Sequence, residues 1–177
     1  MLGWVAPINR ARRLARYPFQ AIQAMAGLYF EQFVVGHVFR HAVTRTVTET
    51  DNTLFCVMTL NMQPLHLDAH FAGKTEFGQR LVNSIFTLGL VIGISVTDTT
   101  LGTTIANLGM SDTRFPNPVF HGDTIRASST ILRKRESKSK PDRGIVWFEH
   151  RGINQRGEIV HVCERKGMMM KRPVAEA

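Results

Sequence analysis

The chain has 177 residues and a mass of 19.9 kDa, which is the usual size of a single globular domain. Its composition is 44% apolar and 20% charged with 14 Gly and 7 Pro, and this excludes a disordered tail protein, a collagen-like repeat and a heptad coiled coil. The net charge of +8 includes four arginines within residues 1–30, which hold no acid. Most of the remaining excess comes from residues 133–143, which favours a local anion site over a broad nucleic-acid-binding face.

Residues 1–28 are predicted to form a basic N-terminal extension, followed by one domain over residues 29–172 and a short tail over 173–177. The extension lacks the apolar stretch of a signal peptide. An organelle transit peptide is the alternative, because such peptides are rich in Arg and poor in acid. They are also rich in Ser, however, and residues 1–28 contain none.

The domain is predicted to begin with a strand and two helices. The β-branched run over residues 37–47 predicts the strand. Thr48 and Asp51 have the spacing of a capping box, so a short helix is predicted to begin there. It is predicted to end near Pro64, because the residue before a proline is disfavoured in a helix. Asp68 is a candidate N-cap of the second helix.

Residues 81–96 are apolar almost all round, which is unusual for a surface helix, and too few to span a bilayer. The segment is therefore predicted to be a buried central helix, with a buried strand as the alternative. Gly89 and Gly93 lie four residues apart, and we expect them to let a sheet approach one face of this helix closely.

Four alternating segments after Asp98 predict strands over residues 103–115, 124–135, 144–154 and 158–170. Pro116 and Pro118 indicate an edge or a bend after the first of them, and Gly122 is expected to take a positive φ in a turn. This order predicts the α+β class, with an antiparallel sheet wrapped around a central helix.

The two cysteines, Cys56 and Cys163, lie far apart in the sequence, so the chain encodes neither a disulfide framework nor a zinc cluster, and no metal site is predicted. Both are interpreted as buried thiols of a protein in the reducing cytoplasm.

Chemistry is most strongly indicated in the polar turn over residues 61–68. His66 is the candidate general acid or base, since an imidazole titrates near neutral pH. A purely structural histidine is the alternative interpretation. Asp68 is interpreted as a helix cap and not as a catalytic acid.

Three segments together resemble one family. The run QPLHLDAHFAGKTEFGQRLVNS, preceded by YFEQFVVG and followed by RFPNPVFHGDTI, is similar to the MaoC-like enoyl-CoA hydratases and dehydratases, over about residues 29–170. This resemblance implies the hot-dog fold, a homodimer or larger homo-oligomer, and addition of water to a 2-enoyl-CoA or its removal. It implies no cofactor, because the CoA thioester is the substrate. A specific nucleic-acid partner is not expected either, because no aromatic stacking motif is interleaved with the basic run, and no membrane partner is expected.

The resemblance also implies roles for individual residues. The family motif Asp-x-Asn-Pro-x-His places its His on His66, its Asp on Asn61 and its Asn on Gln63. An amide cannot accept the proton of a water as a carboxylate does, so Asn61 is expected to orient the water and His66 to carry more of the proton transfer. Asn83 and Ser84 occupy the family's His-Gly pair, which implies that the Ser84 amide stabilises the thioester oxygen. Capping of the helix alone is the alternative.

These departures point to a divergent subgroup that acts on a branched C5 dicarboxylic acyl-CoA, such as mesaconyl- or itaconyl-CoA. Arg114 or Arg80 would then meet the second carboxylate, unless both are solvated surface charges. The basic segment over residues 133–143 is placed between two strands and is expected to bind the CoA phosphates, or to be a mobile hairpin tip. The candidate residues in it are Arg133, Arg135 and Lys138. His121 is a weaker candidate at the mouth of the site.

Two other functions stay open. A non-catalytic acyl-CoA-binding protein is favoured by Asn61, because loss of the carboxylate is what a degraded active site would show. A thioesterase of the same fold commonly carries an acid on the central helix, and no acid occurs between Arg80 and Thr97.

Overall fold

The computed structural model describes residues 27–173. In chain order its elements are η1 (Phe30–Gln32), β1 (Val38–Thr46), α2 (Glu49–Met58), α3 (Pro64–Leu67), α4 (Ala69–Ala72), α5 (Ser84–Thr99), β2 (Thr104–Arg114), β3 (Thr124–Glu136), β4 (Arg143–Ile153) and β5 (Ile159–Met170). Most of the predicted basic extension lies outside the described residues. Gly27 and Leu28 pack with the domain, because their amides donate to the carbonyls of Leu101 and Thr99.

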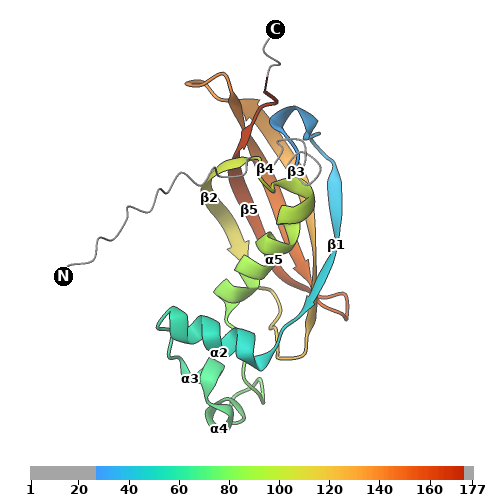
Figure 1. Cartoon of the computed structure of the whole chain (residues 1–177). Coiled ribbons are helices and arrows are strands. Elements are labelled where there is room, and N and C mark those ends of the chain that lie inside the picture. The colour runs from blue at the N-terminus through green and yellow to red at the C-terminus, as the bar shows by residue number, and fades with distance from the viewer. Residues whose placement is uncertain (1–26, 174–177) are drawn as a thin grey trace, which may run out of the picture.

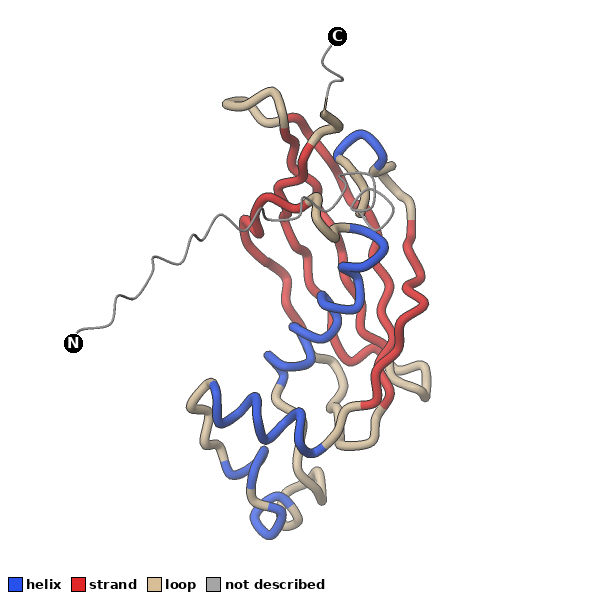
Figure 2. The backbone as a smooth tube through the Cα atoms, viewed as in Figure 1, coloured by secondary structure: helices blue, strands red, loops and turns tan. Residues whose placement is uncertain are grey.

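The five strands form one antiparallel sheet in the order β1-β3-β4-β5-β2. Figure 1 and Figure 2 show the sheet curving around α5, with α2, α3 and α4 gathered beyond one end of it. The predicted α+β class and the sheet around a central helix are therefore confirmed. No helix between residues 27 and 173 is long and apolar enough to cross a membrane.

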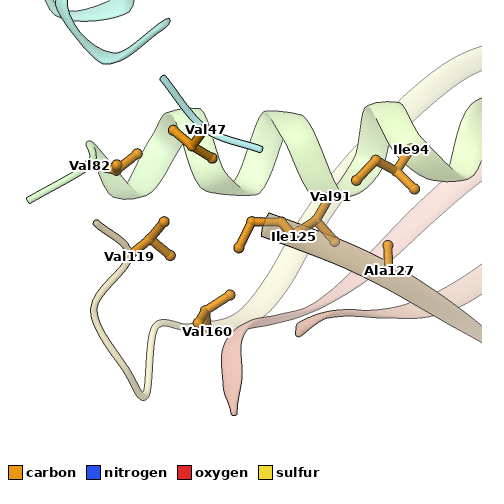
Figure 3. Packing of buried hydrophobic residues seen from close by; sticks show 8 residues of the cluster. All are labelled: Val47, Val82, Val91, Ile94, Val119, Ile125, Ala127 and Val160. Carbon is orange, nitrogen blue, oxygen red and sulfur yellow. The ribbon is translucent and has the colours of Figure 1, made fainter. Parts of the chain in front are cut away.

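The core lies between α5 and the sheet. Val91 and Ile94 of α5 pack with Ile125 and Ala127 of β3 and with Val160 of β5, as Figure 3 shows. The predicted central helix is confirmed, but it begins at Ser84 and not at residue 81. The reason is that the backbone of residue 81 pairs with Phe120 as an isolated bridge.

The expectation that Gly89 and Gly93 let the sheet approach α5 is wrong. A Cβ atom added at either glycine would meet nothing within 4 Å. The glycine that permits close approach belongs to the sheet, because a Cβ atom on Gly152 of β4 would lie 2.5 Å from Cγ2 of Val91. One side of α5 is thus uncovered in the single chain, and 55% of Ile85 is exposed.

The capping box is confirmed at α2, where the Thr48 amide donates to Asp51 Oδ2 at 2.8 Å and the Asp51 amide donates to Thr48 Oγ1 at 3.2 Å. The predicted end near Pro64 is wrong, because α2 ends at Met58. Pro64 instead opens α3, since its fixed φ and missing N–H suit the first position of a helix. Asp68 caps α4 as predicted, accepting from the amides of His70 and Phe71.

The four predicted strands are confirmed to within one residue at each end. β2 is an edge strand, as the prolines after it indicated, and Gly122 has a φ of +92°. Both thiols are free and buried. The basic segment does not lie wholly between strands, because β3 continues to Glu136 and includes its first residues, Arg133 to Arg135.

Candidate active site

A cavity of about 350 Å³ lies where the N-terminus of α5 meets α3. His66, Leu81, Ser84 and Thr87 line one side of it. The segment that joins β2 to β3, residues 115–119, lines another side with Val160 of β5. Most of the wall is apolar, so a few polar groups decide how a bound molecule is oriented.

His66 is held in one orientation by a backbone carbonyl. Its Nδ1 lies 3.0 Å from the carbonyl oxygen of Leu81, which can only accept, so Nδ1 carries the proton. The Leu81 residue is itself fixed, because its amide donates to the Leu65 carbonyl at 3.1 Å. With the donated proton on Nδ1, the nitrogen that can exchange a proton with a bound molecule is Nε2, which suits a general acid or base.

The first turn of α5 supplies the second polar feature. Asn83 is the N-cap, and its side-chain oxygen accepts from the amide of Ile85 at 2.9 Å. Ser84 is the first residue of the helix and lines the cavity. Amides at a helix N-terminus point outward and favour negative charge, so a carbonyl oxygen placed there would be stabilised as charge develops on it. His66 and this helix end thus face one cavity.

Asn61 and Gln63 are placed differently. The Asn61 side-chain oxygen accepts from the amide of Gln63 at 3.3 Å, which closes the turn before α3. Neither Asn61 nor Gln63 is among the described residues that line the cavity, and Gln63 is exposed. The predicted water-orienting contact of Asn61 stays a prediction.

The predicted phosphate-binding residues lie elsewhere. Arg133 is paired with Glu164 at 2.9 Å and lies over the Trp147 ring at 4.6 Å, and Arg135 lies over the same ring at 5.9 Å. Lys138 is in the turn between β3 and β4, which Figure 1 shows at the opposite end of the sheet from α2, α3 and α4. The single chain therefore does not bring these side chains to the cavity.

Arg80, Arg114 and His121 were also candidates, and none of them lines the described cavity. Arg80 pairs with Glu49 at 2.7 Å. Arg114 ends β2 and directly precedes Phe115, which does line the cavity. Burial, with the nearby charge of Arg80, lowers the pKa of His121, so its ring is neutral at pH 7. Residues 27–173 contain no group of three or more His, Cys, Asp or Glu side chains that could hold a metal ion.

Three features of the site were not predicted from the sequence. Thr87 lies one turn into α5, and a threonine within an apolar helix gives no sequence signal of a site. The Leu81 carbonyl is a backbone group with no residue signature. Asn52 is completely buried on α2, and it hydrogen-bonds to the backbone on both sides of the site. Its position one residue after the capping box, on the same helix face as Cys56, was the available signal.

The chain is similar to one protein family and to individual members of known sequence or structure. The family model described as MaoC like domain matches residues 31–150. A mesaconyl-CoA hydratase of Cereibacter sphaeroides is 36% identical over 150 residues, which cover 85% of this chain and 43% of that protein. The match covers 41% and 42% of the length of the next two curated relatives, so this chain spans less than half the length of these proteins.

Two solved structures show the same arrangement. The monoamine oxidase regulatory protein from Archaeoglobus fulgius has a TM-score of 0.75 at 35% identity. The match covers 84% of this chain and 99% of that protein. A Mycobacterium tuberculosis protein with a double hot-dog fold has a TM-score of 0.76 at 22% identity, with 85% of this chain covering 46% of it. The hot-dog fold expected from the sequence is therefore confirmed.

Proposed function

The chain belongs to the MaoC-like domain family, and on that premise we propose that it is a hydro-lyase that adds water to, or removes it from, the 2,3-position of an acyl-CoA thioester. The observation that carries the proposal is that His66, with Nδ1 held by the Leu81 carbonyl, and the N-terminus of α5 line the same cavity. Hydration needs these two groups: one accepts a proton from water, and the other stabilises the thioester oxygen.

In the proposed hydration, the thioester oxygen accepts a hydrogen bond from the Ser84 amide at the start of α5, since the Ile85 amide already donates to Asn83. His66 Nε2 takes a proton from water as the water oxygen bonds to C3, and the electrons of the double bond move toward the thioester oxygen. His66 Nε2 then gives that proton to C2 as the thioester carbonyl re-forms, which completes the addition of H and OH and leaves the imidazole ready for the next turnover. Dehydration runs through the same steps in reverse. Water and the thioester supply every atom, so the proposal includes no cofactor.

The direct test is the loss of enoyl-thioester absorbance with a panel of 2-enoyl-CoAs. We expect turnover with at least one member. Binding of the CoA esters without turnover would overturn the proposal and favour the non-catalytic acyl-CoA-binding protein. Release of free CoA, measured in the same assay with a thiol reagent, would favour the thioesterase.

For the acyl group we propose a short, branched C5 dicarboxylic chain. This finer proposal rests on the 36% identity to a mesaconyl-CoA hydratase. The described cavity is lined by no Lys or Arg. Arg80 and Arg114 each adjoin a lining residue, and Arg80 is already paired with Glu49, so Arg114 is the candidate. We therefore expect mesaconyl-CoA to be hydrated faster than crotonyl-CoA, and Arg114→Gln to reduce that preference.

Asn61→Asp restores the family carboxylate and is expected to change kcat by less than about fivefold. The Asn61 oxygen accepts from the Gln63 amide and the side chain does not line the described cavity, and an aspartate oxygen accepts in the same way. Steady-state hydration rates of the two proteins check this. A gain of a hundredfold or more would instead identify the natural residue as the lesion of a disabled site.

We also propose that two copies pair. One side of α5 is uncovered, with Ile85, Gly89 and Gly93 exposed, whereas the matched hydratase is about twice as long. A second copy would take the place of that additional length. Sedimentation equilibrium is expected to give a mass of about twice 19.9 kDa, and a monomer at micromolar concentration would contradict the proposal.

A cytoplasmic location is proposed from the two free thiols.

A further inference from the structure

Asn52 lies between the two halves of the candidate site. It belongs to α2 and is 0% exposed. Its Oδ1 accepts from the Asn83 amide at 2.8 Å. Its Nδ2 lies 3.1 Å from the carbonyl oxygen of His66 and 3.2 Å from that of Leu81. One side-chain amide therefore bonds to the residue that carries the imidazole, to the carbonyl that orients it, and to the cap of α5.

The orientation of this amide is forced by its neighbours. A backbone N–H can only donate and a backbone carbonyl can only accept, so the oxygen must face Asn83 and the NH₂ group must face His66 and Leu81. The Nδ2 atom also lies 3.0 Å from Nε2 of His121, which accepts while that ring is neutral. Every polar atom of the side chain is thus used.

The Leu81 carbonyl is the point at which Asn52 acts on the imidazole. That oxygen accepts from both Asn52 Nδ2 and His66 Nδ1, the latter at 3.0 Å. If the carbonyl moved, the His66 ring could rotate or take its other tautomer, and Nε2 would no longer be the free base. The bond to the Asn83 amide acts on the other half, because it fixes the residue from which α5 begins.

We propose that Asn52 is a positioning residue that holds the His66 imidazole and the first amides of α5 in register across the cavity. The inference rests on the proposed hydro-lyase function for its catalytic meaning. Its structural content, that one buried amide sets both the tautomer of His66 and the start of α5, is independent of that function. Asn52 does not line the cavity, so it acts through other groups and not on the substrate.

The test compares two substitutions with a control on the same helix. Asn52→Asp keeps the shape and the acceptor for the Asn83 amide, but it loses both N–H donors and sets a carboxylate against two carbonyl oxygens. Asn52→Ala removes every contact. Thr50→Ala is the matched control, because Thr50 is exposed on α2 and lies outside the site. If Asn52→Ala does not fold, Asn52→Asp carries the test.

We expect Asn52→Asp to lower kcat by about 10²-fold with less than a threefold change in KM, because misplacing a reacting group by about 1 Å has an effect of that order. Nitrogen-15 NMR of the His66 ring is expected to show a single Nδ1–H tautomer in the natural protein and in Thr50→Ala, and a mixture in Asn52→Asp. A fall in kcat with an unchanged His66 tautomer would overturn the positioning role.

The two proposals fail in different ways. If the natural protein hydrates no enoyl-CoA, the proposed function is wrong, and the NMR comparison still decides whether Asn52 sets the His66 tautomer. If the natural protein is active and Asn52→Asp matches it in kcat and in tautomer, the positioning role alone is wrong.

Discussion

Replacing His66 with alanine is expected to lower kcat for enoyl-CoA hydration by about 10²- to 10⁴-fold, which is the usual contribution of one general acid–base group. The loss should be near the upper end, because Asn61 stands where the family has a carboxylate and no other titratable side chain lines the described cavity. His66→Gln is expected to lose as much, since a glutamine amide can donate to the Leu81 carbonyl but cannot take a proton from water.

The matched control for this prediction is His70→Ala. His70 lies four residues further along the chain in α4, is exposed, and does not line the cavity. Its removal is expected to leave kcat within about twofold, as is usual for an exposed side chain outside a site. Initial rates of hydration of one enoyl-CoA by the natural protein, His66→Ala, His66→Gln and His70→Ala give the comparison. If His66→Ala keeps more than a tenth of the natural rate, His66 is not the base.

The elements were predictable because their signals are local. The capping box at Thr48 and the alternation in the four C-terminal strands lie within a few residues of the structure that they predict. The start of α5 was misplaced because a distant residue, Phe120, holds the backbone of residue 81 in a bridge. The role of Gly89 was wrong for a related reason: spacing along one helix does not say which face meets the sheet, and Gly152 makes the close approach instead.

The site was predictable in part for the same reason. His66 and Ser84 were found through a motif, and the structure brings them to one cavity. Asn52 was not found, because its bonds reach residues 14 and 31 positions away and nothing near it in the chain records them. The basic residues around Arg133 show the converse, since their charge is plain in the sequence while their partners, Glu164 and Trp147, come from other strands.

Acid is expected to destabilise the fold strongly between pH 6.5 and 4, and His161 is one of the two buried histidines that contribute to this. Its side chain is completely buried on β5, and among the described residues neither ring nitrogen has a hydrogen-bond partner. Burial lowers the pKa of His161 from 6.5 to about 4. His150 acts in the same direction, since burial and then the charge of Arg165 hold its pKa well below the ordinary value.

The sign follows from where the protons bind. Between pH 6.5 and 4 the unfolded chain protonates this imidazole and the folded chain does not, so the free energy of unfolding falls as the pH falls. A shift of this size corresponds to a loss of about 3 kcal/mol by pH 4, at about 1.4 kcal/mol per pKa unit. Urea unfolding at a series of pH values and one fixed protein concentration measures the slope.

His161→Phe is the decisive variant, because a phenyl ring fits beside Phe115, whose ring centre lies 5.3 Å away, and carries no titrating nitrogen. We expect this variant to match the natural protein at pH 7 to within about 1.5 kcal/mol and to lose about 3 kcal/mol less between pH 6.5 and 4. His70→Ala should leave the slope unchanged, because that side chain is exposed to water before and after unfolding. An equal slope in His161→Phe and the natural protein would assign the acid sensitivity to His150 and its contacts instead.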